Sequence, residues 1–154
     1  MGKLKESSIL LFSDERYNKL IEIFTDKEHG ETIQLKNIFL LAASIGFKNS
    51  KRIKRDKKGK EIRASYLSPS EEELLLNLVL NDAEVNGDIE KLNDIAGTGQ
   101  IKKIIDEYIN GGLQLILDKA FFDNWDGHNF NEKYKHYHFD LSRYVLAEIE
   151  SIPF

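Results

Sequence analysis

The sequence predicts a mainly α fold, a single-domain helical bundle of about six helices with one basic β-hairpin or loop. Three observations predict it. Apolar residues recur at intervals of three and four along several segments, which is the spacing of one helix face. Residues that favour helix starts precede those segments, and the chain has only two prolines. Its 154 residues, 41% hydrophobic and 31% charged, suit one globular domain with its own core.

The first two helices are expected within residues 14–46. Ser13 suits the N-cap of a helix over residues 14–26, because an apolar stripe at helical spacing follows it. Residues 1–12 are expected to be a flexible N-terminus. Thr32 is the expected cap of the second helix, whose later half is apolar nearly all round, as in a core helix. Gly46 is expected to end that helix.

The later helices have clear start signals. Ser68, Pro69 and Glu71 have the spacing of an N-cap, a first-turn proline and a capping box, so a helix is expected over residues 72–84. Asp88 and Thr98 are expected to cap two further helices. A last helix is expected from Phe139 or Asp140, after an irregular aromatic and histidine-containing segment at residues 121–139. The expected core comprises Ile38, Phe39, Leu41, Leu75, Leu78, Val79, Ile105 and Ile116.

Two adjacent glycines, Gly111 and Gly112, interrupt the apolar pattern that follows Thr98. Together they cost about 2 kcal/mol in a helix interior relative to alanine. The helix therefore either kinks there or packs closely against another backbone. A notch that docks a partner protein is the alternative interpretation.

Positive charge is concentrated in a basic stretch at residues 48–66. Residues 48–63 contain nine Lys or Arg and two Asp or Glu, a net +7, whereas the whole chain carries −4. Residues 52–55 and 61–66 are predicted to be the arms of a hairpin that turns at Gly59, with an exposed loop as the alternative. The candidate nucleic-acid-binding residues are Lys51, Arg52, Lys54, Arg55, Lys57, Lys58, Lys60 and Arg63.

Three interpretations of this stretch remain open. Its cations can contact the phosphates of duplex DNA, which would release counterions and read no base sequence. They can instead meet an acidic patch on a partner protein. The third possibility is a solvated loop, or one that pairs with the acidic helix start at residues 71–73.

Other classes of site have less support. The chain has no cysteine, which excludes disulfides, Cys-based zinc sites and a cysteine nucleophile. His128, His136 and His138, with Asp123 and Asp126 nearby, are candidates for a metal site, but their spacing matches no standard motif. The loop at residues 97–99 is better explained as a helix cap than as a phosphate loop. No cofactor is expected. No run of 18 apolar residues occurs, so no membrane span is expected and a cytoplasmic location is predicted.

Two stretches carry a family resemblance. One is FLLAASIGFKNSKR at residues 39–52, followed by Glu61-Ile62-Arg63, and the other is EYINGGL at residues 107–113. Together they resemble the small proteins called Dnd system-associated protein 4, which accompany bacterial DNA phosphorothioation and related anti-phage restriction loci. The resemblance implies a role in DNA defence and supplies no catalytic residues.

The functional expectation is a non-catalytic accessory or adaptor subunit, which contacts the DNA backbone through the basic hairpin. Its expected partners are larger subunits that supply nuclease or ATPase work. Duplex DNA and a second copy of the chain are further candidate partners. The alternatives are a protein–protein adaptor without DNA contact and a small metal-dependent nuclease that uses the histidines at residues 128–138.

Overall fold

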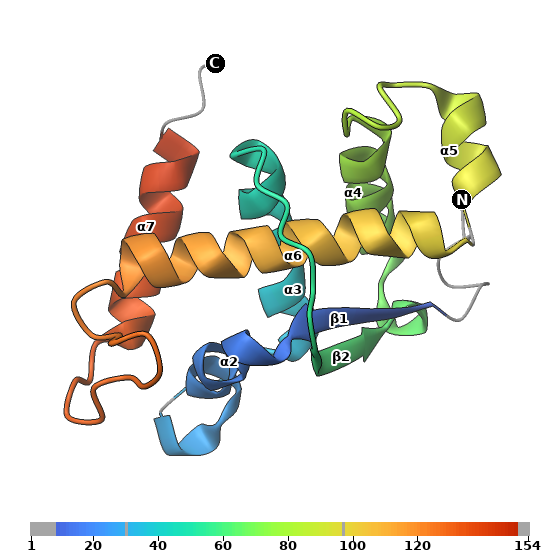
Figure 1. The fold of residues 1–154 in the computed structure, drawn as a ribbon. Coiled ribbons are helices and arrows are strands. Elements are labelled where there is room, and N and C mark those ends of the chain that lie inside the picture. The colour runs from blue at the N-terminus through green and yellow to red at the C-terminus, as the bar shows by residue number, and fades with distance from the viewer. Residues whose placement is uncertain (1–8, 30, 97, 151–154) are drawn as a thin grey trace.

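The computed structural model describes residues 9–29, 31–96 and 98–150 (Figure 1). The long helix α6 (Gly99–Ala120) runs across the middle of the molecule, and α3 (Leu35–Lys48) crosses it in the most extensive contact between two elements. The remaining helices are α2 (Asn18–Thr25), α4 (Pro69–Leu80), α5 (Ile89–Ile95) and α7 (Tyr137–Glu150). Six α-helices and one small sheet in the described part of the chain confirm the predicted mainly α fold.

The sheet has two antiparallel strands that are distant in sequence. Strand β1 (Leu10–Asp14) pairs with β2 (Lys58–Arg63), and Leu11 lies opposite Ile62. The predicted pairing of residues 52–55 with residues 61–66 is therefore wrong. Residues 52–55 offer only Ile53 as an apolar side chain, whereas Leu11 and Ile62 are both buried and anchor the β1–β2 pair in the core.

The predicted helix start at Ser13 is also wrong, because Ser13 is buried within β1. Asp14 instead caps a short 3-10 turn, η1 (Glu15–Tyr17), and α2 begins only after it. The apolar stripe of the predicted helix does form, and its members from Tyr17 to Phe24 are buried. The structure describes residues 10–12 as part of β1, and the rest of the expected flexible N-terminus, up to residue 8, lies outside the described residues.

The later helix caps follow the sequence signals. The capping box between Ser68 and Glu71 is present, and Asp88 and Thr98 cap α5 and α6. Helix α4 ends at residue 80, earlier than expected, and a turn with positive φ at Asn86 and Gly87 follows it. Helix α7 begins at residue 137, two residues before the expected start. Two further 3-10 turns, η2 (Lys27–His29) and η3 (Ala64–Tyr66), complete the described elements.

Glycines bring the backbones of α3 and α6 together. Gly46 lies inside α3 and does not end it, and the N-cap of α3 is Gln34 in place of the expected Thr32. A Cβ atom on Gly46 or on Gly112 would lie under 3.0 Å from a backbone carbonyl oxygen of the other helix. A Cβ on Gly111 would meet the carbonyl of Lys51 in the same way. Helix α6 continues through both glycines, which confirms close packing as their role.

The predicted core is confirmed almost throughout. All the expected core residues are buried except Leu41, which is partly buried and packs against the core. Within the described residues, no helix is long and apolar enough to cross a membrane.

Candidate nucleic-acid interface

Residues 49–57 of the basic stretch form a segment without helix or strand, which crosses α6. In Figure 1 it is the thin trace that leaves α3, passes over α6 and enters β2. The Lys51 N–H donates to the Gly46 carbonyl at 2.8 Å, and the Ile53 N–H donates to the Glu107 carbonyl at 2.9 Å. The carbonyl of Lys57 accepts from the Glu15 N–H at 3.0 Å. These backbone bonds fix residues 51–57, hereafter the crossing segment, to three separate elements.

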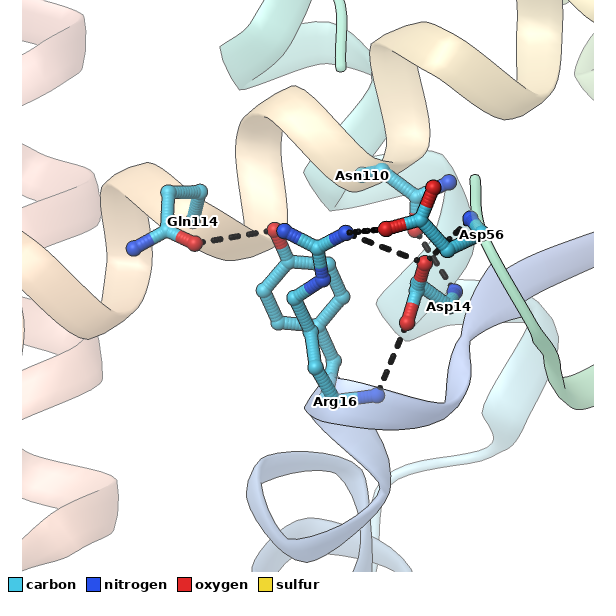
Figure 2. A network of polar contacts seen from close by, with 6 residues as sticks. Asp14, Arg16, Asp56, Asn110 and Gln114 are labelled. Atoms are coloured by element: carbon cyan, nitrogen blue, oxygen red, sulfur yellow. Dashed lines mark hydrogen bonds and ion pairs between the residues drawn. The ribbon is translucent and has the colours of Figure 1, made fainter. Parts of the chain in front are cut away.

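A polar network centred on Asp14 holds the middle of the crossing segment (Figure 2). The Asp14 carboxylate accepts from the Asp56 N–H at 2.7 Å and from the Arg16 guanidinium at 3.2 Å. The same guanidinium reaches the Asp56 carboxylate at 3.3 Å. Asn110 on α6 accepts from the Asp14 N–H at 2.8 Å, and Tyr17 donates to Gln114 at 2.9 Å. The network therefore ties β1, α6 and the crossing segment together.

Asp14 remains ionised at neutral pH. Burial by itself raises the pKa of its carboxyl group, but hydrogen bonds from the Arg16 and Asp56 backbone and from the Arg16 guanidinium outweigh burial and lower that pKa below its ordinary value. The network is thus a buried carboxylate satisfied by protein donors, which indicates a structural role.

Arg52 is bound by carboxylates. Its guanidinium pairs with Asp82 at 2.9 Å, with Glu84 at 3.0 Å and with Glu107 at 3.3 Å. It also lies over the ring of Tyr108, whose hydroxyl donates to Asp82. This cluster joins the crossing segment to α6 and to the turn after α4. In the acidic helix start at residues 71–73, Glu71 pairs with Lys36 on α3.

The other candidate residues differ in their surroundings. Lys54, Lys57 and Lys58 are exposed, whereas Arg55 is partly buried. Lys60 pairs with Glu22 of α2 at 3.2 Å. Lys51 is partly buried at the start of the crossing segment, and Arg63 is exposed at the end of β2. Among the described residues, no ion pair neutralises Lys51, Lys54, Arg55, Lys57, Lys58 or Arg63.

Three cations gather around the ring of Phe12 on β1. The guanidinium carbon of Arg55 lies 4.8 Å from the ring centroid, and the ammonium groups of Lys58 and Lys102 lie 4.9 Å and 4.6 Å from it. Cations are attracted to the negative face of an aromatic ring. The ring is itself buried, so it holds cations from three different elements close to one another.

A pocket of about 250 Å³ lies beside this ring, between the crossing segment and the start of α6. The pocket is lined by Lys54, Arg55, Gly99, Lys102, Lys103, Asp106 and Glu107. We call the four cations of this lining, together with Lys58, the basic face. The sequence reasoning missed Lys102 and Lys103. The sequence contained a signal for them. Helix N-termini usually carry acidic residues, which the helix dipole favours, whereas α6 has no acidic residue in its first turn and has two lysines close to it.

The three histidines do not converge. His128 is exposed, His136 lies against Tyr134 and His138 lies edge-on to Phe24. His136 and His138 flank the start of α7, so the strand that would align their rings does not form there. The Asp126 carboxylate accepts from the backbone of its own loop. In the described ranges, no group of three His, Asp or Glu side chains could hold a metal ion.

Comparison with known proteins gives one match. Residues 13–126 match the model of a family described as DNA sulphur modification system-associated protein 4. The match includes the crossing segment, the basic face and the α3–α6 crossing, and it ends before α7. No curated protein and no solved structure matches the chain. Because the match spans well over half of the chain, the protein belongs to the family of DNA sulphur modification system-associated protein 4.

Proposed function

We propose that this protein is a non-catalytic accessory subunit of a bacterial anti-phage restriction system linked to DNA sulphur modification, and that it binds the DNA backbone through its basic face. The family description supports association with such a system. The observation that carries the DNA contact is the basic face itself. Lys54, Arg55, Lys58 and Lys103 lie close together there without an ion pair to any described residue.

Unneutralised cations on an anchored segment suit phosphate contacts. The crossing segment is held by backbone hydrogen bonds and by Asp14, so its exposed lysines are presented without further ordering of the backbone. Each phosphate that a lysine or arginine neutralises releases counterions, which favours binding and makes it weaken with salt. Contacts of this kind position a protein on DNA without reading its sequence.

The eight sequence candidates divide into two roles under this proposal. Lys54, Arg55, Lys57 and Lys58 contact DNA, with Lys51 and Arg63 at the two ends of the basic stretch. Arg52 and Lys60 stabilise the fold through their ion pairs. Lys102 and Lys103 join the contact set from α6.

A protein–protein adaptor without DNA contact is the second candidate function. Large apolar side chains exposed on α7 favour it: Phe139 is 64% exposed, Leu146 59% and Ile149 50%. Helix α7 lies outside the family match, so this surface is an addition to the shared part of the chain. A defined oligomer in sizing experiments, together with no DNA binding at low salt, would favour the adaptor.

The test is duplex-DNA binding by fluorescence anisotropy over a series of salt concentrations. The variant carries Glu at Lys54, Lys57 and Lys58. Its charge-matched control carries Glu at Lys119, Lys133 and Lys135, which are exposed at or beyond the far end of α6. We expect steep salt dependence for the native protein and the control. We expect the variant to lose about three units from the slope of log K against log salt. Equal losses in the two variants, or no binding by the native protein, would contradict the proposal.

A further inference from the structure

The pocket between the crossing segment and α6 has an unbalanced charge. Four cations and two carboxylates line it. Lys102 pairs with Asp106, whose other oxygen accepts from the Phe12 N–H at 3.0 Å. One oxygen of Glu107 pairs with Arg52, which lies outside the pocket lining, and the other, Oε2, is buried without a hydrogen-bond partner among the described residues. Lys54, Arg55 and Lys103 are left without an ion pair to any described residue, so the pocket favours an anion.

Arg55 adds an independent indication of a ligand. Its Nη1 atom is buried and has no hydrogen-bond partner among the described residues. A buried guanidinium donor without an acceptor costs stability, because it has given up water without replacing it. The neighbouring Asp56 is fixed by Asp14, and the guanidinium is held over Phe12, so Arg55 is kept in this position. An oxyanion in the pocket, which Arg55 lines, would offer its guanidinium group an acceptor.

The lining suits a phosphate group better than an aromatic ligand. Three lysines and one arginine surround a volume of about 250 Å³, which suits a compact, multiply charged oxyanion with several acceptor oxygens. The Phe12 ring, which Arg55 and Lys102 of the lining contact, is covered by cations and buried, so it offers no free face on which a base could stack. Both Asp106 oxygens have protein partners, the Phe12 N–H and the Lys102 ammonium group, and the residue is only 4% exposed. This limits the repulsion between Asp106 and a bound anion.

We infer that this pocket is a phosphate site, which holds one phosphate group between the ammonium groups of Lys54 and Lys103 and the guanidinium of Arg55. The inference rests on the proposed function, since it names the point on the basic face where a phosphate is bound most closely. It also goes beyond that function, because a DNA strand or a free nucleotide carries the same chemical group.

The first experiment titrates the 15N-labelled full-length protein with pyrophosphate and follows backbone amide shifts at constant ionic strength. The pocket variant is Lys103→Ala, and the matched control is Lys133→Ala beyond the far end of α6. Both lysines are exposed and have no side-chain partner among the described residues, so neither change should disturb the fold. We expect shifts confined to residues 53–56 and 99–107. We also expect Lys103→Ala to weaken binding by roughly fivefold and Lys133→Ala to change it by less than about twofold.

The outcomes separate this site from the proposed function. Scattered or absent shifts in the native protein, or equal weakening by the two variants, overturn the phosphate site even if DNA binds. Localised pyrophosphate binding by a protein that does not bind DNA supports the site and contradicts the proposed function.

A second set of titrations identifies the source of the phosphate. It compares a duplex with 5′-phosphates, the same duplex with 5′-hydroxyls and a deoxynucleoside triphosphate, each with the native protein and Lys103→Ala. A preference for the 5′-phosphorylated duplex that Lys103→Ala abolishes identifies a strand end. Equal weakening of both duplexes by Lys103→Ala identifies an internal backbone phosphate, and triphosphate binding tighter than that of either duplex identifies a nucleotide. No effect of Lys103→Ala on any of the three ligands overturns the site.

Discussion

Gly112→Ala is expected to destabilise the protein severely, by about 3 kcal/mol or more. The added Cβ would lie under 3.0 Å from the carbonyl of Ala42 on α3, and backbone atoms cannot move aside as a flexible side chain can. The two helices would have to separate along the most extensive contact in the fold. Overpacked core positions typically cost 1–3 kcal/mol, and a clash between two backbones lies at or above the upper end of that range. Urea unfolding followed by circular dichroism measures the change.

Gly99→Ala is the matched control for this prediction. Gly99 begins the same helix, and a Cβ there would meet nothing within 4 Å. Alanine favours the helical conformation over glycine by up to about 1 kcal/mol, so we expect this variant to be as stable as the native protein or slightly more stable. If Gly112→Ala and Gly99→Ala had the same unfolding midpoint, the close approach of α3 and α6 would be wrong.

Arg52→Ala is expected to lower the free energy of unfolding by about 3 kcal/mol. The change would remove the partner of Asp82, a carboxylate that is 3% exposed, and one partner of Glu107. Breaking a buried ion pair from one side is costly, because the Asp82 carboxylate would stay buried with only the hydrogen bonds from the Tyr108 hydroxyl and the Glu84 N–H. The packing of the guanidinium over Tyr108 would be lost as well. Thermal and urea unfolding of the purified variant test the prediction.

Lys54→Ala, two residues along the same segment, is the control for Arg52→Ala. Lys54 is exposed and has no ion pair to a described residue, so its loss should change stability by less than about 0.5 kcal/mol. Lys54→Ala should weaken DNA binding, whereas weaker binding by Arg52→Ala would follow from unfolding. An Arg52→Ala protein that is as stable as the native one would show that the carboxylate cluster contributes little.

The parts of the fold that the sequence predicted correctly depend on local signals. The capping box at Ser68 and Glu71 is complete within four residues, and the caps at Asp88 and Thr98 need only the next turn. The pairing of β1 with β2 joins segments about fifty residues apart, and no local pattern selects one partner strand over another. Gly46 shows the same limit, since a glycine near an expected helix end resembles a helix terminator until the crossing helix is known.

The sequence likewise identified one part of the candidate site and missed another. The density of lysine and arginine in residues 48–63 was visible in the sequence and identified the segment. The partners that neutralise Arg52 lie 30 or more residues further along the chain, so its structural role became visible only in the fold. Lys102 and Lys103 were missed for the converse reason, because tertiary structure brings them to Lys54 and Arg55.

Lysine footprinting on DNA tests the central claim, that the basic face is the surface that binds DNA. The protein is acetylated briefly with and without a saturating duplex at low salt, and the modified lysines are quantified by mass spectrometry. We predict protection of Lys54, Lys58 and Lys103, with Lys133 and Lys135 unchanged because they lie beyond the far end of α6, which is roughly 30 Å long. Equal protection of both sets, or protection confined to Lys133 and Lys135, would contradict the claim.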